Sequence, residues 1–218
     1  MAFRLLPLLP QDVPHCVSIY FAAFQNAHSL ACWPRDVPAV REWWERMLYD
    51  ELEEPGAWWL KVVLVEEGME GTGEVVCGFG KWVEPKPGVF PETDLPQWPE
   101  GADKALCEET FGAWARRRRE LMGDRGHWYL EIVATSPTHQ GKGVGSKLMR
   151  WGLERADAQG MEAYLEASPE AVPLYEKLGF READRIDTLI RNERVEGVWY
   201  RNLFMIRQPV MQGREAER

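Results

Sequence analysis

Metal-binding patterns are missing from this sequence. It holds four cysteines and four histidines in 218 residues, and no two cysteines form a CxxC pair. The histidines show neither HExxH nor HxH spacing, so no zinc site or catalytic metal site is indicated. The simplest interpretation is that the cysteines are free, buried thiols in a reducing compartment, and we expect no metal cofactor.

Long apolar runs are also missing. No stretch approaches the roughly 20 residues that a membrane-spanning helix needs. Prolines break the short N-terminal run MAFRLLPLLPQDVP, which makes it a weak signal-peptide candidate. We therefore expect a cytoplasmic protein, with the nucleus as the alternative, and no membrane partner.

Positive charge is scarce. Lysine and arginine number 26 against 35 acidic residues, which gives a formal net charge of −9. Binding to nucleic acid needs clustered cations that replace counterions, so we expect no nucleic-acid partner. The one basic run, Arg116–Arg119, falls in an expected helix over 104–122, and we interpret it as a solvated face.

Aromatic residues are plentiful, with eleven tryptophans, and most should pack in the core and in pocket walls. Periodicity and turn residues predict strands at 3–8, 58–67, 74–85, 127–137, 161–168, 185–193 and 198–208, and helices at 13–28, 39–53, 104–122, 146–158 and 169–179. Hairpins at both ends flank a β-α-β-α centre. This order predicts an α/β fold in one domain over residues 1–218, with a mixed sheet and helices on both faces.

Residues 85–101 stand apart, because they carry five prolines and no periodicity. We expect them to form an insertion, either a substrate lid or a mobile surface loop. The last residues, QGREAER, should be frayed.

A glycine turn, QGKGVGSK at 140–147, lies between an apolar run and an expected helix. Free backbone N–H groups at a helix start, with the helix dipole, form a cradle for phosphate. The order Gly145-Ser146-Lys147 fails the Walker A pattern of a kinase-like protein, and Ser146 fails the dinucleotide fingerprint. The alternative is a purely structural role, in which the turn is a tight strand-to-helix connection that holds no ligand.

Two motifs make the chain resemble the GCN5-related N-acetyltransferase (GNAT) family. The first is Gln140-Gly141-Lys142-Gly143-Val144-Gly145, preceded by the run Val133 to Pro137. The second is Leu174-Tyr175, followed after three residues by Gly179-Phe180. The resemblance implies the acyl-CoA N-acyltransferase fold with a mostly antiparallel sheet. The proline-rich insertion and the 104–122 helix resemble extras of fungal members.

The resemblance also implies acetyl-CoA as the cosubstrate. Its diphosphate would lie on the backbone of the glycine turn, and its pantetheine arm would pair with strand 126–135 where that strand parts from strand 161–168. The residues implied in binding are Val133, Ala134, Thr135, Gln140, Gly141, Lys142, Gly143, Val144, Gly145, Ser146 and Ser168. Ser168 stands where many family members have an asparagine.

Acetyl transfer to an amine needs a proton acceptor, a donor to the carbonyl oxygen and a proton for the leaving sulfur. Tyr175 occupies the family's usual acid position, and a backbone N–H near Val133 would bind the carbonyl oxygen. Glu131 is the candidate base, since Tyr129, Glu131 and Val133 should share one face of the strand. Glu166 on the neighbouring strand is the alternative base.

These residues together predict an N-acetyltransferase that moves an acetyl group to the amine of a small molecule, or of a peptide or protein, by direct transfer in a ternary complex. The alternative is a sensor that keeps the fold and binds CoA or another ligand without turnover. Transfer to oxygen stays open. Helices 13–28 and 39–53 and the 85–101 segment should shape the acceptor pocket, and edge strands near the C-terminus suggest a homodimer.

Overall fold

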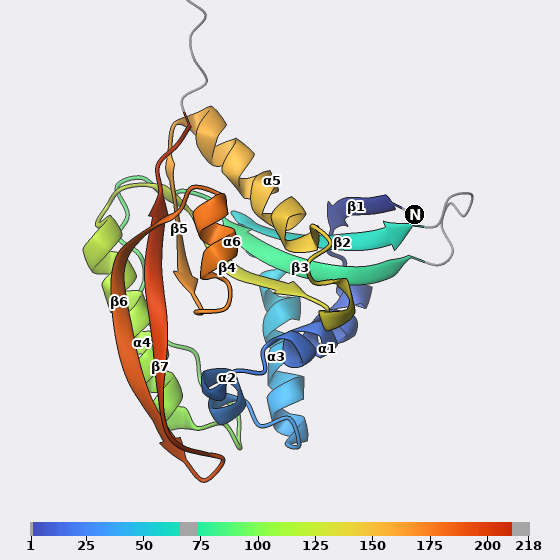
Figure 1. Ribbon diagram of the computed structural model, residues 1–218, viewed down its shortest axis with the longest axis vertical. Helices are drawn as coiled ribbons and strands as arrows, with labels where there is room; N and C mark the ends of the chain where they lie inside the picture. The colour runs from blue at the N-terminus through green and yellow to red at the C-terminus, as the bar shows by residue number, and fades with distance from the viewer. Residues whose placement is uncertain (1, 66–73, 211–218) are drawn as a thin grey trace, which may run out of the picture.

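The computed structural model describes residues 2–65 and 74–210 (Figure 1). Seven of its strands form one sheet: β1 Ala2–Pro7, β2 Ala57–Val65, β3 Val75–Val83, β4 His127–Thr135, β5 Glu162–Ala167, β6 Arg181–Asn192 and β7 Val195–Arg207. Their order is β1-β2-β3-β4-β5-β7-β6, and β4–β5 is the one parallel pair among these strands. The expected mixed, mostly antiparallel sheet is confirmed. The glycine-rich connection at 68–73 and the C-terminal tail fall outside the described residues.

Six α-helices accompany the sheet: α1 Val13–Ala23, α2 Ala27–Cys32, α3 Pro38–Glu51, α4 Lys104–Met122, α5 Val144–Gln159 and α6 Val172–Lys177. The prediction of a single helix over 13–28 is wrong. The chain leaves helical geometry at Phe24 (φ −92°, ψ 83°), and the Asn26 side chain accepts a hydrogen bond from the Ser29 amide at 2.9 Å. An asparagine cap of this kind stabilises a new helix start, which hydrophobic periodicity alone does not reveal.

The helices cover both faces of the sheet. On one side, Leu148, Met149 and Leu153 of α5 pack on Leu60 and Leu130. On the other side, α1 and α3 form a second core against the sheet (Figure 1). None of the helices within the described residues has the length and apolar character needed to cross a membrane.

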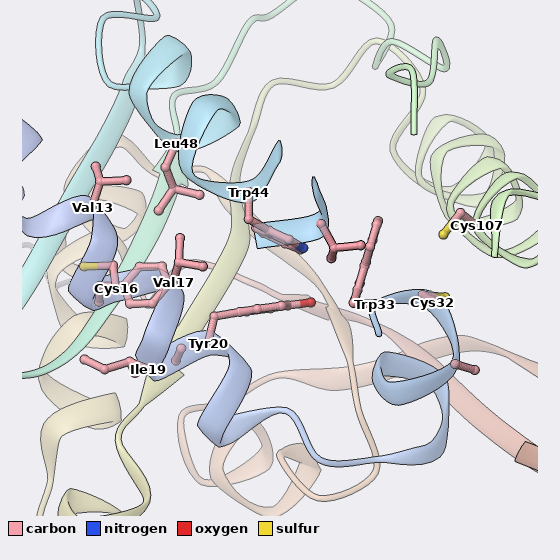
Figure 2. Packing of buried hydrophobic residues seen from close by; sticks show 14 of the residues in the cluster. Val13, Cys16, Val17, Ile19, Tyr20, Cys32, Trp33, Trp44, Leu48 and Cys107 are labelled. Carbon is pink, nitrogen blue, oxygen red and sulfur yellow. The ribbon is translucent and has the colours of Figure 1, made fainter. Parts of the chain in front are cut away.

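Aromatic side chains fill the core beneath α1 and α3. The Tyr20 and Trp44 rings lie 4.1 Å apart between centroids, with Val17 and Leu48 beside them (Figure 2). Trp33 lies against the same cluster and is 1% exposed. Five of the eleven tryptophans belong to this core or pack against it. Three more lie in the core under α5, and two, Trp58 and Trp199, are exposed.

The proline-rich segment 85–101 is tied to this core. The Trp98 ring lies 5.7 Å from that of Trp33 and 5.9 Å from that of Trp43, and the Trp43 Nε1–H donates to the Gln97 carbonyl at 2.8 Å. Pro91 and Pro99 are buried. These contacts join the end of the segment to the core under α1 and α3, whereas Val89 and Phe90 near its start are about half exposed.

Close packing of α5 on the sheet depends on Gly152. A Cβ atom at this position would lie 2.2 Å from the Trp82 ring, and Trp82 is fully buried. We expect Gly152→Ala to lower the free energy of unfolding by about 3 kcal/mol, because neither the helix nor the indole has room to move.

Gly112 in α4 provides the matched control. A Cβ atom there would meet only the end of the Arg116 side chain at 3.2 Å and Leu95 at 3.5 Å. Gly112→Ala should change stability by less than about 1 kcal/mol, since alanine also favours the helix. Urea unfolding of both variants tests the prediction, and equal losses in the two would contradict it.

Candidate functional site

The parallel strands β4 and β5 part near the middle of the sheet. Their pairing runs from His127 and Glu162 to Leu130 and Leu165 and then stops, although β4 continues to Thr135. On its other edge, β4 stays paired with β3 as far as Thr135. Within the part of the chain that the structure describes, residues 131–135 therefore have no strand beside them on the β5 side. This edge offers backbone N–H and C=O groups to an amide-bearing ligand.

The glycine turn lies directly beyond this gap. Gly141 and Gly143 have φ angles of 72° and 88°, which is left-handed backbone that glycine adopts without strain. Helix α5 begins at Val144. The Lys147 amide N–H donates the first hydrogen bond of the helix, to the Gly143 carbonyl at 3.0 Å. The amides before Lys147 in this helix therefore have no intrahelical acceptor, and such amides can bind an anion.

The side chains of the turn play a secondary part. Gln140 Nε2 donates to the Thr135 carbonyl at 3.2 Å, and Lys142 Nζ donates to the Thr138 carbonyl at 2.9 Å. Val144 is buried in the core under α5. Ser146 is half-buried in the first turn of the helix.

Residues on the β5 side complete the surroundings of the gap. Ser168 directly follows β5, and its carbonyl accepts the Ala171 amide at 3.0 Å. Tyr175 on α6 is 5% exposed, and its ring contacts that of Phe180 edge-on at 6.0 Å. Burial raises the pKa of Tyr175 well above its usual range, so the phenol stays protonated.

Glu131 occupies a β-bulge. Ile132 pairs with Lys81 and Leu130 pairs with Trp82, so Glu131 is the extra residue between them. Because of the bulge, Val133 packs in the core under α5, whereas Ile132 packs in the core under α1 and α3. The expectation that Val133 shares a face with Tyr129 and Glu131 is therefore wrong, since a bulge interrupts the alternation of side chains.

The Glu131 carboxylate forms an ion pair with a buried lysine. Lys81 Nζ lies 2.9 Å from Glu131, 2.8 Å from Glu51 and 3.3 Å from Glu54. Burial alone would lower the pKa of Lys81, but Glu131 and Glu51 raise it above its ordinary value. The lysine stays charged, and Glu131 is held as its carboxylate partner.

Glu166 is in a different environment. It lies on β5 one residue beyond the last β4–β5 pair, and the Tyr129 hydroxyl donates to its Oε2 at 2.9 Å. The buried Tyr164 hydroxyl lies near the same carboxylate without forming a well-aligned hydrogen bond. Burial raises the pKa of Glu166 to about 7, against the opposing effect of Arg118. A carboxylate with this pKa can take up a proton near neutral pH.

Sequence reasoning missed the contribution of α4 to this site. The Arg116–Arg119 run is not a solvated face throughout, because the Arg118 guanidinium lies 3.6 Å from the centre of the Tyr129 ring. Arg119 likewise lies 4.9 Å from the Phe90 ring. Four consecutive arginines signal charge but not which of them faces the sheet.

A pocket of about 190 Å³ opens on the α4 side of the sheet. Glu131, Tyr129, His127 and Arg118 form one wall, and residues 89–92 of the proline-rich segment form another. Of the two candidate bases, Glu131 lines this pocket, and Glu166 reaches it only through its hydrogen bond with Tyr129. The 85–101 segment lines this pocket, whereas neither α1 nor α3 contributes a lining residue to it.

Comparisons with known proteins agree with this geometry. Residues 17–180 match the Acetyltransferase (GNAT) family. The chain is 28% identical over 155 residues to an "Acetyltransferase" of the fungus Stachybotrys chartarum, covering 68% of this chain and 64% of that protein. It is 34% identical over 149 residues to Mycothiol acetyltransferase of Brachybacterium faecium, covering 62% and 45%. The chain thus spans less than two thirds of the length of either relative.

Solved structures share the fold. Histone acetyltransferase HPA2 and related acetyltransferase from Corynebacterium glutamicum has a TM-score of 0.58 at 24% identity, covering 97% of this chain and 98% of that one. Arabidopsis thaliana NAA60 has a TM-score of 0.58 at 14% identity, covering 96% and 100%. The family match extends over more than half of the sequence, and so the chain belongs to the Acetyltransferase (GNAT) family.

Proposed function

We propose that this chain transfers the acetyl group of acetyl-CoA directly to an amine held in the same complex, the amine of a small molecule or of a peptide or protein. The observation that carries the proposal is the parting of β4 and β5 directly beside the glycine turn. An anion cradle alone fits many phosphate ligands. A cradle continuous with an open strand edge fits a diphosphate that carries an amide-bearing arm.

The residues around the gap suit CoA. The free amides of 140–146 and the dipole of α5 would hold the diphosphate. The pantetheine amides would pair with β4 at Val133, Ala134 and Thr135, and Ser168 would face the arm from the β5 side. The arm would thereby satisfy backbone groups that β5 leaves without a strand partner.

Bound in this way, acetyl-CoA supplies an acetyl thioester. The amine nitrogen forms a bond to the acetyl carbon, and the bond between that carbon and sulfur breaks. A backbone N–H near Val133 stabilises the carbonyl oxygen as charge develops on it. The amine proton passes to a carboxylate, and the leaving sulfur takes its proton from the Tyr175 hydroxyl.

Two carboxylates compete for the amine proton, and Glu166 is the better candidate. Glu131 is paired with Lys81 at 2.9 Å, so its carboxylate is already engaged by a buried cation. Glu166 combines a position at the mouth of the gap with a pKa of about 7. Glu131 would then line the acceptor pocket and attract the cationic form of an amine.

Turnover separates this proposal from a CoA-binding sensor. Calorimetry with CoA and acetyl-CoA tests binding, and thiol release with amines, aminoglycosides, polyamines and peptide N-termini tests transfer. We expect both to be positive. Binding without thiol release for any acceptor would favour the sensor, and no binding of either nucleotide at millimolar concentration would exclude both functions.

Glycines at the two ends of α5 provide a matched test of the cradle. Gly143 (φ 88°) precedes the helix and Gly160 (φ 64°) follows it, and an added Cβ would meet no atom within 4 Å at either position. Alanine should therefore cost about 1 kcal/mol of folding free energy at each, from left-handed backbone strain.

Only Gly143→Ala should weaken CoA binding, by tenfold or more, because it shifts the amides of the cradle. Calorimetric Kd values for the two variants and the parent protein check this. Equal affinity in Gly143→Ala and Gly160→Ala would place the diphosphate elsewhere.

A further inference from the structure

Arg118 is bound on two sides. Its guanidinium carbon lies 3.6 Å from the Tyr129 ring centre, and its Nε–H donates to His127 Nε2 at 3.1 Å. His127 Nδ1 lies 2.9 Å from the Arg125 carbonyl and therefore carries the hydrogen. Nε2 is then left free to accept from Arg118. Burial lowers the pKa of His127 to about 4, so this neutral tautomer persists at physiological pH.

Tyr129 connects this arginine to the site. Its ring lies under the guanidinium, and its hydroxyl donates to Glu166 Oε2 at 2.9 Å. A continuous line of contacts therefore runs from α4 through β4 to β5. A shift of the ring would carry the hydroxyl away from the carboxylate, because the phenol is rigid.

The charged and titratable groups around Glu166 come from three elements. Tyr129 and Glu131 lie on β4, Tyr164 lies on β5 and Arg118 lies on α4. Arg118 is the cation of this set, so it favours the ionised carboxylate, whereas Glu131 disfavours it. Helix α4 falls in the long connection between β3 and β4, which are adjacent antiparallel strands. The inserted helix thus delivers a charge to a site otherwise built from the sheet.

We propose that Arg118 is a positioning residue for acetyl transfer, holding the Tyr129 ring so that its hydroxyl aligns the Glu166 carboxylate toward the amine. The inference rests on the proposed function with Glu166 as the proton acceptor. Arg118 acts through Tyr129 and Glu166 and takes no proton itself.

The test compares Arg118→Met with Arg117→Met. Arg117 lies on the same helix, is 43% exposed and forms ion pairs with Glu120 and with Asp184 on β6. Its loss removes a charge of the same sign but leaves the contacts of Tyr129 and Glu166 in place. The readout is the pH profile of kcat/KM with acetyl-CoA and the best acceptor. In Arg118→Met the acid limb should move upward by about one pH unit, since an opposite charge within a few ångströms shifts a carboxylate by about 1–3 units.

Two further variants keep the inference testable if methionine weakens the fold. Arg118→Lys keeps the charge and should restore most of the acid limb while lowering kcat, because ammonium cannot hold the ring and donate to His127 as guanidinium does. In a Glu166→Gln background, Arg118→Met should leave the remaining pH profile unchanged.

The outcomes separate the inference from the function on which it rests. No turnover in the parent protein with intact CoA binding overturns the proposed function. Full activity in Glu166→Gln overturns the choice of base. If Glu166→Gln is inactive while Arg118→Met keeps the profile of Arg117→Met, or loses activity equally at every pH, the positioning role of Arg118 is overturned and the rest stands.

Discussion

Glu166→Gln is expected to lower kcat for acetyl transfer by about 10²–10⁴-fold, the usual contribution of a positioned general base. Glutamine keeps the size of the side chain and still accepts a hydrogen bond from Tyr129, but it takes up no proton. Affinity for CoA should stay within about twofold, since Glu166 lies on the α4 side of the sheet, away from the glycine turn. Steady-state kinetics of thiol release with a saturating amine measures the loss.

Glu131→Gln is the matched control. It removes a carboxylate two positions from Tyr129, and Lys81 keeps Glu51 and Glu54 as partners. We expect at most about a tenfold change, mainly in KM for the amine, because this side chain attracts the acceptor rather than taking its proton. A collapse of kcat in Glu131→Gln with near-normal turnover in Glu166→Gln would reverse the assignment.

The direction in which kcat/KM changes with pH tests the assignment of Glu166 as the base independently. A base works in its ionised form, so kcat/KM of the parent protein should rise with pH and level off above about 7, the pKa of Glu166. The same shift affects stability. A carboxyl whose pKa rises from 4.5 in the unfolded chain to about 7 on folding binds more protons when folded, so stability is lost as pH rises through that window.

At pH 8, Glu166→Gln should therefore have a free energy of unfolding up to about 3 kcal/mol higher than that of the parent protein, and so a higher melting temperature. At pH 4 its stability should differ little from that of the parent protein. A stability difference independent of pH would mean that Glu166 does not titrate in this range. Thermal melts at the two pH values decide between these results.

Tyr175→Phe should reduce kcat by about 10²-fold, the low end for proton transfer by a positioned side chain. The ring is buried and packs against Phe180, so phenylalanine fits the same space and CoA should bind as before. Tyr20→Phe is the control, because Tyr20 is also buried but belongs to the core under α1. Both variants should melt within a few degrees of the parent protein.

Only Tyr175→Phe should lose turnover. Turnover equal to that of Tyr20→Phe, with CoA binding intact, would show that the leaving sulfur departs without a proton from Tyr175. The two variants should be compared at several pH values. As pH rises, the released sulfur can remain a thiolate and needs no proton, so the loss of turnover in Tyr175→Phe should shrink.

The geometry of the glycine turn could be predicted from sequence because its information is local. Gly141 and Gly143 mark left-handed backbone directly before a helix, and Tyr175 lies a few residues from the Gly179-Phe180 pair. Backbone of this kind depends on residues adjacent in the chain. The order of strands followed from hairpin signals in the same way.

The acceptor half escaped sequence reasoning because it depends on pairing across the sheet. A bulge opposite Lys81 and Trp82 decides whether Glu131 and Val133 share a face. The sequence of neither strand indicates that bulge. The role of Arg118 requires knowing how α4 lies over Tyr129. The break at Phe24 reflects competition between an asparagine cap and an apolar periodicity that continues past it.

The glycine turn and the pocket beside α4 lie on opposite sides of the sheet. The glycine turn, α5 and α6 lie on one side, and the pocket that we propose for the acceptor lies on the other, with α4 and residues 89–92. Substitutions in the second set alter which amine fits without disturbing the first. A library randomised at residues 89–92 and on the inward face of α4 should yield catalysts with new acceptor preferences and the parental cofactor affinity, which makes this chain a suitable scaffold for laboratory evolution.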